Sequence, residues 1–241
     1  MYTTQTGVIN PSQVAKRLNL PLDSPPKLIR GHMMYGLHVY LDDTYCYFTM
    51  LRRPIPRVLS LYYYIQKGWP NSPVADMTIE EYIESGHHSY VPNDQVRRLA
   101  GSPHSDEALL QRAIDHLEHD IAFGLTERFD ESLLLLQRTL RWPRPPLYIR
   151  TNTNRERPSR STLDSRVVEQ IKEQNQLDIR LYEWAKEEFH ARIDRQEKLE
   201  SDLARYRNLN SALGIVGAPI LTLYQTTRAL LDSFSSTRSK S

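Results

Sequence analysis

The sequence predicts an α/β fold built on a mainly parallel sheet. Two short apolar runs of strand length, Tyr45–Leu51 and Ile121–Leu125, are typical of buried strands. Segments with helical spacing of apolar residues lie between and after them, and this alternation is typical of parallel α/β sheets. With 241 residues, of which 39% are hydrophobic, the chain is long enough for one domain with a substantial core.

The N-terminal part of the chain carries few structural signals. Residues 1–26 are polar and end in a Pro-Pro breaker, so we expect a poorly defined segment with one short helix over Ser12–Leu18. Lys27–Gly31 predicts a brief strand, and Tyr45–Leu51 follows it as the central strand. The α/β domain is therefore expected to start at residue 27.

Helices and strands alternate through the middle of the chain. Pro54 is expected to begin a helix that reaches about Gln66, because proline is favoured at the first helical position. Further expected elements are helices over Thr78–Glu84, Ser105–His119 and Glu127–Leu140, and strands over Ile121–Leu125 and Leu147–Arg150. The core stripe of the helix Glu127–Leu140 is expected to be Phe129, Leu133, Leu136 and Leu140.

The C-terminal third is predicted to be helical. Apolar residues repeat at helical spacing from Leu163 to Ile193, with an interruption at Gln174–Gln176. A further helix is expected over Ser211–Leu231. We therefore place the α/β domain at 27–208, with long helices from about residue 162, and a helical tail at 209–241.

Composition narrows the classes of function. The net charge of +2 is too small to indicate nucleic-acid binding, so any anion site must be a local cluster. The single cysteine, Cys46, allows no intrachain disulfide and no Cys-based metal site. No run of about 18 apolar residues predicts a membrane span. The start shows no pattern of a secretion signal, so a cytoplasmic location is expected.

The turn after the strand Tyr45–Leu51 gathers groups that bind anions. Arg52 stands at the carboxyl end of this strand, where open α/β sheets bind ligands. Helical periodicity places Arg57 and Ser60 on the side of the next helix opposite its apolar residues. Guanidinium and hydroxyl groups beside a helix N-terminus form a site for a phosphate. The alternative, of equal weight from periodicity alone, is a surface helix whose arginines only face solvent.

This stretch resembles the 3′-phosphate-binding motif of the sulfotransferase superfamily, close to Arg-Asp-Pro-x-x-Arg-x-x-Ser-x-Tyr-Tyr in its carbohydrate members, including those like heparan-sulfate 2-O-sulfotransferase. The matching residues are Arg52, Arg57, Ser60, Tyr63 and Tyr64. The resemblance implies that Arg52 and Ser60 hold the 3′-phosphate of 3′-phosphoadenosine 5′-phosphosulfate (PAPS), with Arg57 also at the cofactor. It further implies a P-loop-NTPase-like parallel sheet flanked by helices. One departure is Arg53, which stands where the motif has an acidic residue.

A histidine lies in a second stretch that resembles this family. Ile29–His38 is similar to the Gly-His segment ahead of the central strand. The resemblance implies that His32 is the catalytic base that takes the proton of the acceptor hydroxyl. His38 is expected to be structural. Without the family, a lone histidine after a strand is more often structural.

Two further stretches keep the order of the family. Asn93–Gly101 resembles its Asn-x-Gln-x-Arg-x-Leu-x-Gly run, which makes Gln95 and Arg97 candidates for substrate binding. The alternative for these two residues is a polar helix face. Phe123–Leu136 resembles a strand–turn–helix of the family and is interpreted as architecture.

A basic loop over Asn152–Arg160 corresponds to the segment that folds over the nucleotide in this family. Arg155, Arg157 and Arg160 are therefore candidates for cofactor binding. A solvated charged loop is the alternative, and it has equal weight.

The resemblance also implies a motif that this sequence does not contain. Members of the family carry an earlier Pro-Lys-x-Gly-Ser/Thr-Ser/Thr loop, whose N–H groups and lysine stabilise the charge of the transferring sulfuryl group. We therefore expect a sheet that lacks the first strand and this phosphate loop. Three explanations stay open: a recorded start downstream of the true one, a decayed gene, or a loop supplied by another chain.

The expected function is transfer of a sulfuryl group from PAPS to a hydroxyl of a carbohydrate. The partners are then the nucleotide donor and a carbohydrate acceptor, with no nucleic acid and no metal. The alternative is an inactive or truncated sulfotransferase-like module that binds nucleotide or glycan without turnover.

Overall fold

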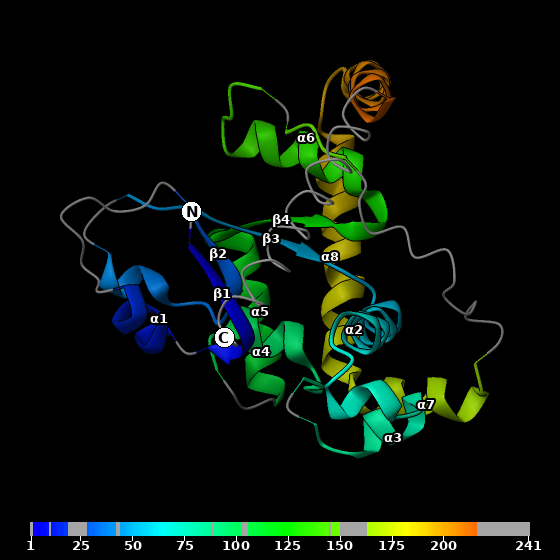
Figure 1. Cartoon of the computed structure of the whole chain (residues 1–241). Coiled ribbons are helices and arrows are strands. Elements are labelled where there is room, and N and C mark those ends of the chain that lie inside the picture. The colour runs from blue at the N-terminus through cyan, green and yellow to red at the C-terminus, as the bar shows by residue number, and fades with distance from the viewer. Residues whose placement is uncertain are drawn as a thin grey trace, which may run out of the picture.

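In the computed structural model, the chain forms two pairs of parallel strands with helices packed around them (Figure 1). The structure describes residues 2–9, 11–18, 28–41, 44–87, 89–102, 106–144, 146–149 and 163–215. Parallel strand pairing and the alternation of strands with helices confirm the predicted α/β class. Within the described residues, the two strand pairs form two separate sheets.

The first strand pair lies near the start of the chain. Strand β1 (Tyr2–Ile9) runs parallel to β2 (Ile29–Met33), and helix α1 (Pro11–Leu18) lies between them in sequence. The helix expected in this region is confirmed. The prediction of a sheet without a first strand is corrected: a strand precedes β2, although no phosphate-loop motif follows it. Its threonine, valine and isoleucine residues favour extended backbone, which outweighs the polar character of the segment.

The second strand pair positions the candidate site. Strand β3 (Tyr47–Leu51) and strand β4 (Ile121–Leu125) pair in parallel, in register along their whole length, so that Leu51 lies opposite Leu125. Strand β4 has its predicted bounds, and β3 starts two residues later than expected. Because the two strands end side by side, they share one carboxyl edge, where open α/β sheets place their ligands.

Helices surround the second strand pair. They are α2 (Pro54–Gly68), α3 (Ile79–Glu84), α4 (Asp94–Ala100), α5 (Glu107–His119), α6 (Phe129–Thr139), α7 (Ser165–Gln174) and α8 (Gln176–Asp194), with a further helix over 199–215. Three short 3-10 helices are η1 (Leu37–Tyr40), η2 (Pro73–Asp76) and η3 (Thr126–Arg128). None of the helices in the described ranges is long and apolar enough to cross a bilayer.

Several helix limits follow the sequence signals closely. The capping box expected at the start of α3 is present, because Glu81 N–H donates to Thr78 Oγ1 and Thr78 N–H donates to the Glu81 carboxylate. Asn175 separates α7 from α8, within the predicted interruption. Helix α4 was not predicted as a separate helix, although its residues lie in a stretch that resembles the family.

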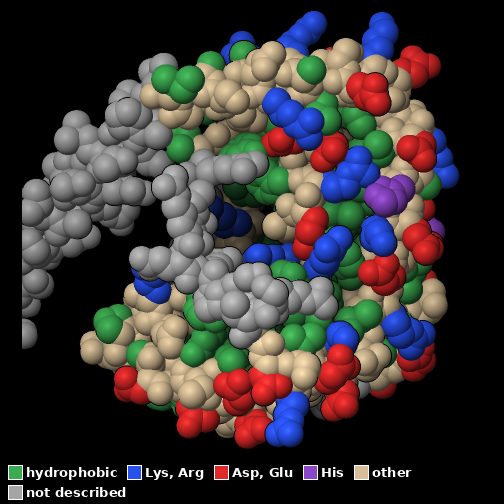
Figure 2. All heavy atoms as spheres, turned by 90° about the vertical axis from the view of Figure 1, so that its right-hand side faces the viewer, with side chains coloured by type: hydrophobic (Ala, Val, Ile, Leu, Met, Phe, Trp, Pro, Cys, Tyr) green, Lys and Arg blue, Asp and Glu red, His purple; other side chains and the backbone are tan. Residues whose placement is uncertain are grey.

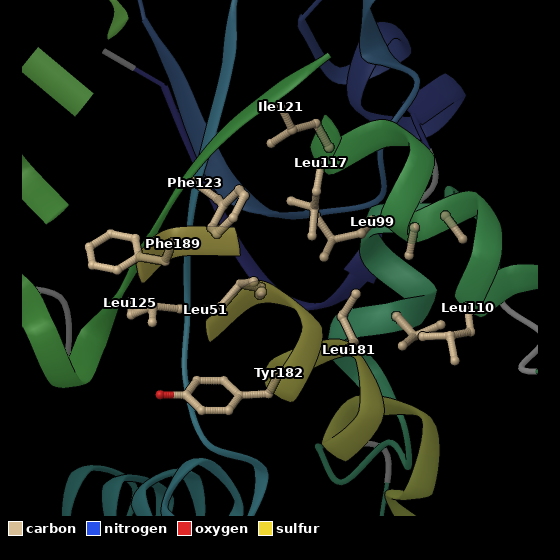
Figure 3. Close-up of a cluster of buried hydrophobic side chains, with 14 of the residues drawn as sticks. Leu51, Leu99, Leu110, Leu117, Ile121, Phe123, Leu125, Leu181, Tyr182 and Phe189 are labelled. Atoms are coloured by element: carbon tan, nitrogen blue, oxygen red, sulfur yellow. The ribbon is translucent and has the colours of Figure 1, made fainter. Parts of the chain in front are cut away.

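The largest apolar core lies between the β3–β4 pair and helices α4, α5 and α8 (Figure 3). Leu51 and Leu125 from the strands belong to the same buried cluster as Leu181 and Phe189 from α8. Burying these side chains removes apolar surface from water, which is the main stabilising term for such a domain. A second cluster joins α2, α3 and α7.

Helix α6 packs closely against β4. A Cβ atom added at Gly124 would lie 2.5 Å from Ser132 Cβ and 2.9 Å from Met50 Sδ, so only glycine fits there. The core stripe predicted for this helix is confirmed at Leu136 and in part at Leu133, which packs half-buried against a smaller apolar cluster, but it is wrong at Phe129 and Leu140. The helix buries Ser132, Leu134, Leu135 and Leu136. The helix turns differently because Ser132 docks on the end of β4 and because Leu134 packs against the 199–215 helix.

The strand predicted over Leu147–Arg150 is wrong for residues 147–149, which are irregular; Arg150 lies outside the described residues. Backbone groups in this segment bond to side chains of the 199–215 helix instead of to a strand. Tyr148 N–H donates to Asn210 Oδ1 at 3.1 Å, and Tyr206 Oη donates to Pro146 O at 2.6 Å. The predicted helix over Ser211–Leu231 is present up to residue 215, and its remainder lies outside the described residues.

Candidate functional site

Arg52 lies at the carboxyl end of β3, as predicted, and its backbone is held by Gln95 of α4. Arg52 N–H donates to Gln95 Oε1 at 3.0 Å, and Gln95 Nε2 donates back to Arg52 O at 2.9 Å. The Gln95 side chain is buried, with only 6% of the residue exposed. The structure therefore brings these two predicted residues together, with the amide of Gln95 directed at the backbone of Arg52.

Asp94 of α4 holds a second predicted residue. Its carboxylate pairs with Arg57 of α2 and with Arg98 of its own helix, whose Nε lies 2.8 Å from Oδ2. Asp94 is 4% exposed, so both pairs are largely shielded from water. Burial would raise the pKa of Asp94, but the charges and hydrogen bonds of Arg57 and Arg98 outweigh burial and lower it.

His32 of β2 lies beside this arginine pair. The side chain is exposed to solvent, yet its pKa is lowered, first by desolvation from the surrounding atoms and then by the charges of Arg98 and Arg57. Asp94 opposes this shift. A lowered pKa keeps the imidazole neutral near pH 7, which is the form that accepts a proton.

The segment after His32 is attached to α4. Tyr35 N–H donates to Arg98 O at 2.7 Å, and a Cβ atom at Gly101 would lie 2.9 Å from Tyr35 O, at a positive φ of 72°.

His38 lies in an aromatic cluster nearby. Its N–H donates to Tyr47 Oη at 2.8 Å, and its Nδ1 lies 3.1 Å from the same hydroxyl. These contacts agree with a structural role for His38.

Ser60 lies in the middle of α2, on a half-buried part of its surface. Within the described part of the chain its hydroxyl makes no hydrogen bond, so it can serve a ligand. The apolar side of α2 agrees with the periodicity, because Ile55, Val58, Tyr62 and Ile65 are buried. Tyr63 is half-buried against the second core, and Tyr64 is exposed.

The N-terminus of α2 offers few backbone donors. Pro54 and Pro56 have no N–H group, so among the first three helical residues only Ile55 carries one. Arg57 N–H already donates to Arg53 O at 3.0 Å. An anion at this turn would therefore be held mainly by side chains.

Glu127 holds the backbone of Arg53, the residue that departs from the motif. Its Oε1 accepts a hydrogen bond from Arg53 N–H at 2.9 Å, and its Oε2 accepts one from Tyr182 Oη at 2.8 Å. Desolvation first, and then Glu127, raise the pKa of Tyr182 to about 12. Figure 3 shows the Tyr182 hydroxyl pointing out of the apolar cluster. Glu127 follows β4, and its place at the shared strand edge is the signal that could have identified it.

Helices α4 and α8 cap each other. Asn93 Oδ1 accepts the N–H groups of Leu177 and Asp178 at the start of α8, at 3.0 and 3.2 Å. Asp178 in return accepts the N–H groups of Gln95 and Val96 at the start of α4, at 3.1 and 2.8 Å. Asp178 is 1% exposed, and this burial raises its pKa against the effect of the two N–H groups. The exchange fixes the position of α4.

The remaining predicted residues are Arg97 of α4 and three arginines of the basic loop. Arg97 of α4 is half-buried. Arg155, Arg157 and Arg160 lie outside the described residues. Figure 2 shows that one side of the molecule is hollowed and that Lys and Arg side chains line part of the hollow. The described residues contain no group of histidine, cysteine and carboxylate side chains suited to a metal ion.

The fold and the site together define an α/β protein with arginines at the carboxyl edge of parallel strands and a histidine whose pKa these arginines help to lower. The sequence model described as Galactose-3-O-sulfotransferase matches residues 11–216. The chain belongs to this family of carbohydrate sulfotransferases.

Individual relatives agree with this assignment. The chain is 26% identical to galactose-3-O-sulfotransferase 3 of Mus musculus over 220 residues, which cover 80% of this chain and 51% of the relative. It is 29% identical to heparan-sulfate 6-O-sulfotransferase 1 of Cricetulus griseus over 192 residues, which cover 64% of this chain and 47% of that protein. It is 27% identical to heparan-sulfate 6-O-sulfotransferase 3 of Mus musculus over 192 residues, which cover 64% of this chain and 40% of that protein. The chain thus spans about half, or less, of the length of these relatives.

Proposed function

We propose that this chain binds PAPS and transfers its sulfuryl group to a hydroxyl of a carbohydrate. The observation that carries the proposal is the turn between β3 and α2, where Arg52, Arg57 and Ser60 follow a parallel strand inside the region matched to the family. The names of the relatives specify carbohydrate acceptors, and this supports the same class of acceptor here.

The 3′-phosphate of the donor is assigned to Arg52 and Ser60, with Arg57 nearby. A guanidinium and a hydroxyl suit a phosphate because they supply charge-assisted and neutral hydrogen bonds together. The Ser60 hydroxyl has no partner among the described residues, which fits this role. Arg57 is held by Asp94, so its charge stays at the α2 face of the site.

His32 is assigned as the base. It would take the proton of the acceptor hydroxyl while the hydroxyl oxygen forms a bond to sulfur. The bond between sulfur and the bridging oxygen of the phosphosulfate breaks, and adenosine 3′,5′-bisphosphate leaves. The lowered pKa of His32 supports this role, because a neutral imidazole is ready to accept the proton.

The finer parts of the proposal concern the sheet, the basic loop and the compartment. A P-loop-NTPase-like sheet is supported by the parallel pairing of β3 with β4. Arg97 remains a predicted substrate contact, and Arg155, Arg157 and Arg160 remain predicted cofactor contacts. The cytoplasmic location and the domain limits at 26/27 and 208/209 also stay predictions.

Calorimetry with adenosine 3′,5′-bisphosphate tests the donor site. We expect the wild-type chain to bind it and the Arg52→Ala variant to bind about tenfold or more weakly, because one charge-assisted hydrogen bond is lost. Arg180→Ala is the matched control, since Arg180 pairs with Glu107 on the surface. Equal affinity of wild type and Arg52→Ala would remove the basis for the assignment.

A second candidate function is binding of nucleotide without turnover. The specific observation in its favour is Arg53, which replaces the acidic residue of the motif. Sulfate transfer from labelled PAPS separates the two functions. Turnover supports the enzyme, whereas nucleotide binding without turnover supports the module.

A further inference from the structure

We propose that Gln95 is a positioning residue for the 3′-phosphate site: it sets the direction in which the Arg52 side chain leaves the end of β3. This inference rests on the proposed function, because it assumes that Arg52 binds the 3′-phosphate. Gln95 would then act on the site indirectly, through Arg52, and not by direct contact with the substrate.

The geometry of the two hydrogen bonds carries the inference. Gln95 bonds both the N–H and the C=O of the same residue, Arg52, at 3.0 and 2.9 Å. Fixing both groups fixes the two backbone dihedrals of Arg52, and these dihedrals determine where its Cβ points. An amide supplies one acceptor and one type of donor, so a glutamine matches this pair of groups.

Gln95 is itself held firmly. Its own N–H donates to Asp178 Oδ2 at 3.1 Å, and only 6% of the residue is exposed to solvent. Asp94, the preceding residue, pairs with Arg57, and Asn93 caps α8. Three consecutive residues thus hold the end of β3, the charged side of α2 and the start of α8. The α4 N-terminus therefore sets the relative positions of Arg52 and Arg57.

The experiment compares two nucleotides that differ only in the 3′-phosphate. The dissociation constants of adenosine 3′,5′-bisphosphate and adenosine 5′-monophosphate are measured by calorimetry on the full chain. Their ratio reports how well the 3′-phosphate is recognised. A merely structural role of Gln95 would lower stability or weaken both nucleotides alike, but would leave this ratio unchanged.

Gln95→Met removes both hydrogen bonds at nearly constant length. We expect the ratio to fall about tenfold in this variant, as for the loss of one charge-assisted bond. Gln95→Glu keeps the acceptor for Arg52 N–H and loses the donor, and we expect an intermediate ratio. Gln137→Met is the matched control, because Gln137 Nε2 also donates to a backbone carbonyl, that of Trp142, at 3.1 Å. This control should keep the wild-type ratio.

Each outcome is decisive. A wild-type preference for the bisphosphate that is lost in Gln95→Met and kept in Gln137→Met supports the inference. A preference that persists in folded Gln95→Met overturns it and leaves the proposed function standing. If Gln95→Met does not fold, Gln95→Glu decides in the same way. A wild-type chain without any preference overturns the proposed function as well.

Discussion

Strands β3 and β4 both end at a residue whose N–H and C=O bond to a single side chain, but the two side chains come from different parts of the chain. At the end of β3, Gln95 bonds both the N–H and the C=O of Arg52 across 43 residues of sequence. At the end of β4, Ser132 bonds both the N–H and the C=O of Leu125, at 2.8 and 2.9 Å, across seven residues. Both side chains are buried, at 6% and 0% exposure.

The comparison shows that the contact at the end of β4 stabilises the local fold, whereas the contact at the end of β3 helps to build the candidate site. Ser132 comes from the helix that directly follows β4, so its bonds only close a local turn. Gln95 comes from a distant helix that also carries Asp94 and Arg98. The bond at β3 therefore brings charged groups from a distant part of the chain to the strand end, whereas the bond at β4 joins residues that are close in sequence.

The largest expected effect of breaking this arrangement is at Asp94. Asp94→Ala should lower the free energy of unfolding by about 3 kcal/mol, because Arg57 and Arg98 lose their shielded partner. Urea denaturation measures this loss. Because the pKa of Asp94 is lowered in the fold, the advantage of wild type is complete above 3.8, declines as the pH falls from 3.8 towards the folded-state pKa, and is lost below that pKa. An unchanged urea midpoint would contradict the importance given to this carboxylate.

Ser132→Ala should cost less, about 2 kcal/mol, because it leaves the buried N–H and C=O of Leu125 without their hydroxyl partner. The preference for adenosine 3′,5′-bisphosphate should remain at the wild-type level in this variant. Urea denaturation and calorimetry test the two parts. Loss of the preference here would show that the two strand ends do not differ in function.

His32 should give a smaller effect that depends on pH. Its pKa is lowered in the fold, so below the ordinary value of 6.5 the unfolded chain takes up the proton first and stability falls until the pH passes the folded-state pKa. His32→Gln cannot take up this proton. The stability of the variant relative to wild type should therefore rise between pH 7 and pH 5. A constant difference across this range would exclude the lowered pKa.

The smallest effect is expected at the surface pair of Arg180 and Glu107. Two bonds of 2.7 and 2.6 Å join these side chains, but both are more than half exposed. Glu107→Gln should leave the urea midpoint unchanged within error, because water and salt screen exposed pairs. A loss comparable to that of Asp94→Ala would mean that burial does not distinguish the two carboxylates.

Local patterns predicted most of the elements of this fold. The bounds of β4, the start of α2 at Pro54 and the break at Asn175 all follow from periodicity or proline chemistry. Strand β1 was missed because its polar composition hid a run of residues that favour extended backbone. The irregular segment 147–149 was taken for a strand because its partner, Asn210, is distant in sequence.

The candidate site was predicted in its residues but not in their contacts. Arg52, Arg57 and Gln95 were all identified, yet the sequence could not show that α4 holds the first two. Periodicity reports which side of a helix is apolar, and it contains no information about the partner of a polar side chain. Glu127 and Asp94 were missed for the same reason, since both act on groups far away in the chain.

The two prolines at the start of α2 determine how strongly the affinity of this site for a nucleotide depends on salt. With one backbone N–H in that turn, the attraction for a nucleotide comes from the full charges of arginine side chains. Dissolved ions weaken such charges over about 8 Å at physiological ionic strength. Affinity for the bisphosphate should therefore decline steeply as sodium chloride is added, so the ionic composition around the protein would regulate its occupancy.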